Sequence, residues 1–269
     1  MQEANSGLLE ATCAGVAARP STSLAMPALE LSALQDRACG MPAFSAADDL
    51  AGYRLLVADS RVTRERVWRL AHRAYCQRGH FSPDQDGGVY TLPHDTDSET
   101  LTLLVEDQTG ADVATVTLVF DSPRGLPCEC IYKSELNVLR SENRRIVEVA
   151  RLAFCTRQSL PKMLLVRLFN IIYIYARLIK GYTDFVVEVV PHHSGFYKRL
   201  LKFEPCGPNR KWALGQNSVV TLLRLDLELA RQEIERFRFE PCNSNLYAES
   251  MTRAGEEAVI EFFSKAHCP

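Results

Sequence analysis

No two cysteines in this chain have the spacing of a zinc-binding or redox-active loop, although nine cysteines are present. The nearest pair, Cys128 and Cys130, has a single residue between its members, whereas a zinc site needs spaced pairs or nearby histidines. The odd number and the scattered positions are typical of free thiols in a reducing compartment. We therefore expect a cytoplasmic protein that holds no metal.

The sequence also has no long uninterrupted apolar run and no large excess of charge of one sign. Its most apolar segment, residues 163–180, contains Arg167, Asn170, Arg177 and Lys180, whereas a membrane-spanning helix needs about 20 apolar residues in succession. This segment is predicted to be a buried helix, and no transmembrane segment is expected. The formal net charge of −2 argues against a protein that binds nucleic acid through its overall charge.

The composition changes twice along the chain and predicts three parts. Residues 1–50 are rich in alanine, serine and proline without a sustained period, which indicates a poorly ordered tail. Residues 51–227 alternate between helical and strand-like patterns, as in an α/β domain. Residues 228–269 have helical spacing and predict a C-terminal helical extension that packs on the domain or on a second copy.

Residues 144–204 organise the predicted domain. A strand over residues 146–154, a helix over 163–180 and a strand over 185–190 predict a crossover that places two parallel strands side by side. The other strands follow hairpin or closing-pair signals and are predicted at residues 53–58, 101–106, 112–120, 211–214 and 219–225. The expected fold is a mixed α/β sheet in which the two central strands are parallel and the others antiparallel.

Each of the two parallel strands contains a carboxylate, Glu148 or Glu188, at a position where an aliphatic residue is expected. Burying a charge without a partner costs several kcal/mol. The two glutamates therefore need either a partner such as Arg151, as in a structural ion pair, or a chemical task.

Three segments of the predicted crossover, residues 148–154 (EVARLAF), 168–176 (LFNIIYIYA) and 181–189 (GYTDFVVEV), resemble the catalytic core of the N-acyl amino acid synthases. These enzymes are acyltransferases of the GNAT fold and are related to the acyl-homoserine lactone (autoinducer) synthases. The resemblance implies a mostly antiparallel sheet whose central parallel strands splay apart. It also implies that the pantetheine arm of an acyl donor lies in the gap, where backbone N–H groups form an oxyanion hole.

The same resemblance implies roles for individual side chains. Glu148 is expected to be the general base or to position the attacking amine, and Arg151 to orient Glu148 or to hold the carboxylate of the acceptor. Tyr197 matches the position of a tyrosine that protonates the leaving thiolate, and a place in the core is the alternative. Substrate contacts are expected from Arg73, Phe154, Phe169 and Glu188.

One departure from the GNAT pattern concerns the acyl donor. Relatives that use coenzyme A carry a glycine-rich loop that cradles the pyrophosphate, but residues 156–162 (TRQSLPK) contain no glycine. We therefore expect the acyl-phosphopantetheine of an acyl carrier protein as the donor substrate, with no separate cofactor. Because such carriers are acidic, a basic docking face is predicted, with a solvated run of charge as the alternative, at Arg140, Arg144, Arg145, Arg157, Lys162 and Arg167.

These observations predict an enzyme that transfers a long-chain acyl group from acyl carrier protein to the α-amine of an amino acid. Three alternatives remain: an autoinducer synthase that acylates S-adenosylmethionine, a coenzyme A-dependent acetyltransferase, and a carrier-binding protein without turnover. The choice of acceptor is expected to depend on residues 78–98, a long polar loop of the kind that often forms a lid.

Replacement of Glu148 by glutamine tests its predicted role. The Glu148→Gln variant keeps the shape of the side chain but removes its charge, so turnover is expected to fall at least about tenfold while the fold is retained. Steady-state kinetics and a circular dichroism spectrum measure the two effects. Turnover close to that of the wild type would remove Glu148 from the mechanism.

Overall fold

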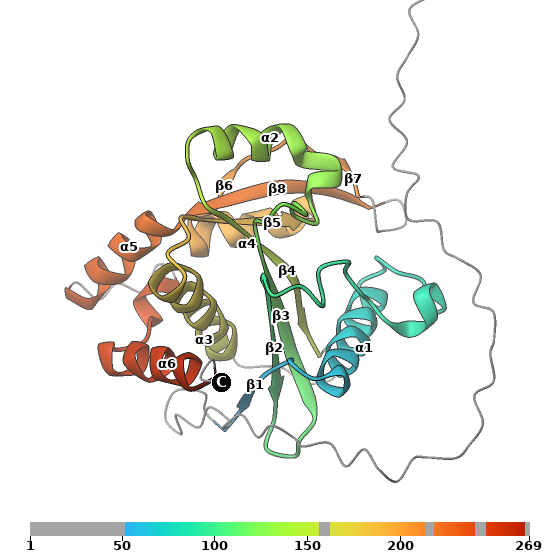
Figure 1. Ribbon diagram of the computed structural model, residues 1–269, viewed down its shortest axis with the longest axis horizontal. Helices are drawn as coiled ribbons and strands as arrows, with labels where there is room; N and C mark the ends of the chain where they lie inside the picture. The colour runs from blue at the N-terminus through green and yellow to red at the C-terminus, as the bar shows by residue number, and fades with distance from the viewer. Residues whose placement is uncertain (1–51, 156–161, 213–217, 240–245, 267–269) are drawn as a thin grey trace, which may run out of the picture. The chain divides into compact units, whose positions relative to one another are not determined.

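The computed structural model describes residues 52–155, 162–212, 218–239 and 246–266 (Figure 1). The predicted tail over residues 1–50 and the segment 156–161 lie outside these residues. In chain order the elements are β1 (Arg54–Val57), α1 (Arg61–Gln77), η1 (Gln85–Gly88), β2 (Thr100–Glu106), β3 (Asp112–Phe120), α2 (Glu129–Ser141), β4 (Ile146–Phe154), α3 (Lys162–Tyr173), η2 (Ile174–Ile179), β5 (Asp184–Val189), α4 (Pro191–Leu201), β6 (Glu204–Pro205), β7 (Arg210–Lys211), β8 (Val219–Asp226), α5 (Leu227–Phe239), η3 (Leu246–Glu249) and α6 (Arg253–Ala266).

The described strands form one mixed sheet in the order β1-β2-β3-β4-β5-β8-β6, and β7 pairs with β8 off this path. Neighbouring strands are antiparallel except for β4 and β5, which run parallel. The helical connection between these two strands, α3, continues after Tyr173 as the π-helical turn η2. The predicted mixed sheet, with two parallel strands joined by a helical crossover, is therefore confirmed.

Strands β4 and β5 separate soon after they begin. Their pairing covers Ile146 with Asp184, Val147 with Phe185 and Glu148 with Val186. Beyond these positions β4 stays paired with β3, and β5 stays paired with β8. In Figure 1 strands β2, β3 and β4 run in a clearly different direction from β5 and β8. The sheet is therefore forked after Glu148, as the splay of the predicted fold requires.

A β-bulge in β4 lies next to the fork. Strand β3 advances by two residues between Thr115 and Thr117, whereas the facing residues of β4, Ala153 and Ala150, are three positions apart. Arg151 lies within this extra length and has a backbone φ of 49°, a left-handed conformation that costs a non-glycine residue about 1–2 kcal/mol. The bulge shifts the alternation of the strand, so that Ala150 and Ala153 both belong to the same core.

The two faces of the central strands have separate hydrophobic cores. Val147 and Val187 pack in the core that contains residues of α3, η2, α5 and α6. Ile146 and Val186 pack in the core that contains residues of α1 and α2. Because successive side chains of a strand point to opposite faces, Glu148 lies on the same face as Ile146, and Glu188 on the same face as Val186. Both carboxylates therefore lie on the α1 and α2 side of the sheet.

The C-terminal helices belong to the core on the other face. Ile234 and Phe237 of α5 and Phe263 of α6 are buried there with residues of α3 and η2. Phe263 contacts the ring of Tyr175 in η2, with ring centroids 4.5 Å apart. Among the described residues, no helix has the length and apolar character that crossing a membrane requires.

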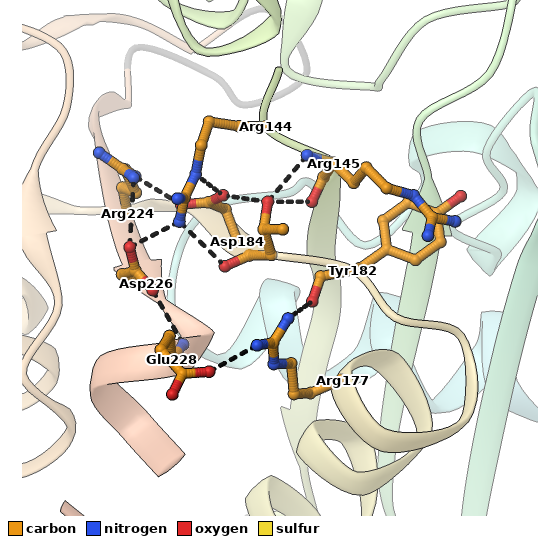
Figure 2. A network of polar contacts seen from close by, with 9 residues as sticks. Arg144, Arg145, Arg177, Tyr182, Asp184, Arg224, Asp226 and Glu228 are labelled. Atoms are coloured by element: carbon orange, nitrogen blue, oxygen red, sulfur yellow. Dashed lines mark hydrogen bonds and ion pairs between the residues drawn. The ribbon is translucent and has the colours of Figure 1, made fainter. Parts of the chain in front are cut away.

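A network of ion pairs ties the starts of β4 and β5 together (Figure 2). The fully buried carboxylate of Asp184 accepts hydrogen bonds of 2.6 Å from Arg144 Nε and 2.6 Å from Arg224 Nε. The Thr183 hydroxyl donates to the same carboxylate at 2.5 Å. Arg144 also reaches Asp226 at 2.5 Å. These contacts join β5 to β8 and to the chain before β4, at the end of the sheet where the parallel strands still pair.

Replacement of Asp184 by asparagine tests how much this network stabilises the fold. The Asp184→Asn variant leaves Arg144 and Arg224 without their shared buried counter-charge, so the free energy of unfolding is expected to fall by about 3 kcal/mol. Urea denaturation measures the change. The control is Glu65→Gln, which removes the exposed Arg61–Glu65 pair of α1 and is expected to change stability by less than about 0.5 kcal/mol. Equal effects of the two variants would contradict the assigned role of Asp184.

Candidate active site

Glu148 is held at the fork by the start of helix α2. The residue is 3% exposed, and its Oε2 accepts a 2.8 Å hydrogen bond from the backbone N–H of Cys128, which precedes α2. Burial raises the pKa of the Glu148 carboxyl to about 7, although the contacts with Cys128 favour the ionised form. Its charge therefore changes near neutral pH.

Glu188 lies further along β5 and has one free acceptor. Its Oε2 accepts a 3.1 Å hydrogen bond from the indole N–H of Trp212. Its Oε1 is buried and has no hydrogen-bond partner among the described residues. Burial raises the pKa of the Glu188 carboxyl to about 8, and the negative charge of Glu148 adds to the rise. The site thus contains two interacting carboxylates whose pKa values lie in the neutral range.

A cavity of about 320 Å³ lies at the fork of the sheet. Glu188 is part of its wall, together with residues from the ends of β4 and β5, from α1 and the loop after it, from α3 and α4, and from the chain around β7 and β8. These further lining residues are Tyr75, Arg78, His80, Leu152, Phe154, Leu165, Val189, Val190, His193, Phe196, Tyr197, Trp212 and Val220. The volume lies in the range of small-molecule sites, so the fork is the candidate active site.

The structure gives Arg151 a different partner from the expected Glu148. Its guanidinium, which has no exposed surface, forms a two-pronged ion pair with Asp95, in which Nη1 is 3.0 Å from Oδ2 and Nη2 contacts Oδ1. Nε donates to the Thr117 hydroxyl at 3.1 Å, and Nη1 donates to the Tyr90 carbonyl oxygen at 3.1 Å. These contacts do not orient Glu148 and leave no exposed group for an acceptor carboxylate. Arg151 instead fastens residues 78–98 to the bulge of β4.

The fastened loop, residues 78–98, covers the carboxylates with aromatic rings. Phe81 stacks on Trp212 with ring centroids 5.6 Å apart and an interplanar angle of 10°. Tyr90 meets Phe81 edge-on at 5.0 Å, and Tyr75 of α1 contacts Tyr90 at 5.2 Å. Phe81 and Tyr90 belong to the hydrophobic core on the side of the sheet that carries the two glutamates. The loop has the position of a lid, as its length predicts.

The fork brings together only part of the predicted substrate and catalytic set. Phe154, Glu188 and Tyr197 line the same cavity, and burial raises the pKa of the Tyr197 hydroxyl above its ordinary value. Phe169 lines a separate inner cavity, although its ring meets that of Tyr197 with centroids 6.4 Å apart. Arg73 lies on a groove between α1 and the β2–β3 hairpin, away from the carboxylates.

The predicted docking arginines lie mainly at the paired end of the parallel strands. Arg140 is neutralised by Asp121 and Glu129, and Arg144 belongs to the Asp184 network. Arg145 lies over the ring of Tyr182, with Cζ 4.3 Å from the centroid (Figure 2). Arg167, on α3, approaches the Glu249 carbonyl oxygen at 3.4 Å. Arg157 and the side chain of Lys162 lie outside the described residues. The described members therefore form no single basic face at the mouth of the cavity.

Two contacts of the site were not predicted from the sequence: the ion pair of Arg151 with Asp95 and the hydrogen bond of Trp212 to Glu188. Asp95 lies in an aperiodic loop, and the signal for it is indirect, because a buried arginine requires a carboxylate from somewhere in the chain. Trp212 follows the short strand β7, and no pattern connects it to Glu188. Within the described residues, no group of three or more histidine, cysteine, aspartate or glutamate side chains has an arrangement that could hold a metal ion.

A forked parallel pair, with a cavity at the fork and carboxylates beside it, defines a GNAT-type acyltransferase, and the chain is an enzyme of this class. The sequence model of the family described as N-acyl amino acid synthase FeeM matches residues 66–226. This match covers more than half of the chain, and the protein therefore belongs to the FeeM family.

Solved structures of similar fold include FeeM, an N-acyl amino acid synthase from uncultured soil microbes, with 18% identity and a TM-score of 0.55 over 65% of this chain and 90% of FeeM. The AHL synthase LasI has 12% identity and a TM-score of 0.47 over 65% and 90% of the two chains. A mutant of spermidine N-acetyltransferase SpeG from Vibrio cholerae has 15% identity and a TM-score of 0.41 over 66% of this chain and 95% of SpeG.

 The likeness to FeeM shows the shared fold. No curated protein sequence matches this chain.

Replacement of Asp95 by asparagine tests the fastening of the lid. The Asp95→Asn variant leaves the buried Arg151 guanidinium without its counter-charge, so residues 78–98 are expected to open more often and the fold to lose about 3 kcal/mol of stability. Hydrogen exchange of the backbone amides of residues 78–98 measures the opening, which is expected to become at least about tenfold faster.

The matched control is Arg124→Gln, which removes the more exposed pair between Arg124 and Asp97 in the same loop. Its effect on exchange is expected to be small because partly exposed pairs contribute roughly 0–1 kcal/mol. Exchange in Asp95→Asn that stays at the wild-type rate would contradict the role of Arg151 as the anchor of the lid.

Proposed function

We propose that this enzyme transfers a long-chain acyl group from the phosphopantetheine thioester of an acyl carrier protein to the α-amine of an amino acid. The observation that carries the proposal is the cavity at the fork, in which Glu188 offers an unpartnered carboxylate oxygen beside the diverging strands. Membership of the FeeM family, whose name states this class of product, supports it.

The fork suits a thioester donor. Within the described residues, strand β4 has no ladder partner on its β5 side after Glu148. Backbone N–H groups along that edge are therefore available to a thioester carbonyl oxygen, on which negative charge develops as the amine attacks. Tyr197 lines the cavity on the α4 side, and the resemblance to the GNAT enzymes implies that its hydroxyl protonates the departing sulfur.

A carrier protein rather than coenzyme A is favoured by the charge around the mouth of the cavity. Arg78 and His193 line the cavity, and exposed basic side chains continue along α4 and just past its end. These exposed side chains are His192, Lys198, Arg199 and Lys202. Within the described parts of the chain, none of them forms an ion pair. An acidic carrier whose phosphopantetheine enters the fork would meet this surface, which we call the α4 basic face.

Helix α3 offers a route for the acyl chain. Leu165 of α3 lines the cavity at the fork, and Val166 and Phe169 line a neighbouring apolar cavity of about 30 Å³. The paired rings of Phe169 and Tyr197 lie between the two. A long chain that follows this route requires Phe169 to turn aside, because the inner cavity alone is too small to hold it.

In this proposal the acceptor amine binds on the lid side of the fork. Glu188, Trp212 and Tyr75 line the cavity there, so an α-ammonium group would find a carboxylate and aromatic faces together. The amine then attacks the thioester carbon, an amide forms and the carrier thiol leaves. The residues of the lid that face this place, foremost His80, are the ones from which acceptor selectivity is expected.

Product analysis tests the proposal. Purified protein is incubated with a long-chain acyl carrier protein and a mixture of the amino acids, with long-chain acyl-coenzyme A in a parallel tube, and lipid products are identified by mass spectrometry. An N-acyl amino acid from the carrier-protein tube is the expected result. Product from coenzyme A alone would overturn the assigned donor. Acylation of S-adenosylmethionine, but of no amino acid, would overturn the assigned acceptor.

Charge reversal tests the α4 basic face in the same assay. The double variant Lys198→Glu with Arg199→Glu is expected to raise the KM for acyl carrier protein at least about tenfold, because a docking surface acts mainly through charge. The KM for a small acyl-pantetheine thioester is expected to stay unchanged. Arg145→Glu, at the paired end of the strands, is the matched control. A larger effect of Arg145→Glu would return docking to the arginines predicted from the sequence.

A further inference from the structure

The two carboxylates of the active site differ in what a substrate can reach. Glu188 lines the cavity at the fork, whereas Glu148 is not among its lining residues and is 3% exposed. Glu148 is engaged by the backbone N–H of Cys128. Glu188 keeps Oε1 without a hydrogen-bond partner in the described parts of the chain. An amine that enters the cavity therefore meets Glu188 and not Glu148.

An unpartnered carboxylate oxygen in this place is suited to an amine. An ionised carboxylate only accepts hydrogen bonds, and a buried acceptor without a donor costs about 1–3 kcal/mol. A bound ammonium or amine group supplies the missing donor and removes this cost. The indole N–H of Trp212 holds Oε2, so the carboxylate is already oriented before the amine arrives.

We propose that Glu188 is the general base that takes the proton from the acceptor amine, and that Glu148 is a positioning residue behind it. This assignment rests on the function proposed above. The pairing of Glu148 with Val186 places the two carboxylates on the same face of adjacent strands, two residues apart along β5. From there the charge of Glu148 acts on Glu188 without contact with the substrate.

The proton transfers balance in a single turnover. The acceptor ammonium gives one proton to ionised Glu188 and becomes an amine with a free lone pair. The nitrogen attacks the thioester carbon, the C–N bond forms and the C–S bond breaks. The second N–H proton passes to the departing sulfur and gives the thiol. Glu188 returns its proton to water, so thioester and ammonium become amide, thiol and one released proton.

The pH dependence of turnover follows from this role. Only the ionised carboxylate accepts a proton, so turnover is low below the pKa of Glu188 and rises as pH increases through it. Burial, with the charge of Glu148, raises that pKa to about 8. The rise in turnover is therefore expected above neutral pH. A histidine base would place the rise below about pH 6.5, because burial lowers the pKa of His80 and His193 in this cavity.

The other titratable groups around the pair do not account for a rise near pH 8. Burial raises the pKa of the surrounding tyrosines and of the Cys128 thiol and lowers that of the two histidines, so these groups are neutral there: Tyr75, Tyr90, Cys128, Tyr132, Tyr197, His80 and His193. Arg151 is paired with Asp95, and Arg78 lines the mouth of the cavity. Glu148 itself titrates near this range, and a variant must separate it from Glu188.

The test is the pH profile of kcat for three variants with long-chain acyl carrier protein as donor. Two acceptors are compared: the amino acid identified by product analysis, and aminooxyacetate, whose nitrogen is already unprotonated at neutral pH. Glu188→Gln is expected to lower kcat with the amino acid at least about 100-fold and to remove the rise with pH. With aminooxyacetate the loss is expected to stay below about tenfold, because no proton has to be taken from the nitrogen before attack.

The other two variants are expected to move the rise in opposite directions. Glu148→Gln is expected to lower the plateau of kcat, as stated above, and it also removes a neighbouring negative charge, so the rise moves to lower pH. Trp212→Phe removes a hydrogen bond that favours the ionised form of Glu188, so the rise moves to higher pH. A purely structural role of these residues would change kcat without moving the profile.

Each result has a defined meaning. Equal losses with both acceptors in Glu188→Gln, or a profile that keeps its rise, would overturn the assignment. If Glu188→Gln does not fold, as judged by circular dichroism, unmoved profiles in Glu148→Gln and Trp212→Phe would overturn it instead. If the wild-type enzyme is active and the variants give these results, only the assignment of Glu188 is overturned. If the wild-type enzyme forms no product from any donor, the proposed function and this assignment are both overturned.

Discussion

The short pairing of β4 with β5 is the constraint on which the rest of the structure depends. After Glu148 the two strands keep their outer partners, β3 and β8, but not each other. The fork is stable because the Asp184 network joins the strands at their start, while a hydrophobic core packs against each face of the sheet. The cavity is therefore a product of the backbone topology, and the side chains around it only shape its chemistry.

Desolvation provides that chemistry. Burial on the α1 and α2 side of the sheet removes water from Glu148 and Glu188, and this raises the pKa of both carboxyls into the neutral range. The lid can remain in place because a second pair of charges, Arg151 with Asp95, is buried with matched geometry. The buried ion pair of Arg151 and Asp95 thus holds the loop beside the two neighbouring glutamates, Glu148 and Glu188.

Much of the fold was predictable from the sequence, but only part of the site. The patterns of residues 146–154 and 185–190 predict parallel strands, and the carboxylates in them predict a chemical task, because alternation and charge are local properties. The partner of Arg151 was not predictable, since Asp95 lies 56 positions away in a loop without a period. The grouping of Arg140, Arg144 and Arg145 in sequence suggested a docking face, but two of the three are neutralised by acids from distant segments.

The fastened lid has a consequence for the order in which substrates bind. Opening the loop would strip the buried Arg151 guanidinium of its carboxylate, so a closed loop is favoured, and in the function proposed above both substrates would then use the mouth beside α4. The pantetheine arm of a docked donor would fill that passage. With that donor the acceptor would have to occupy the lid side first, and an ordered kinetic mechanism in which the amine binds before the thioester is the expected consequence.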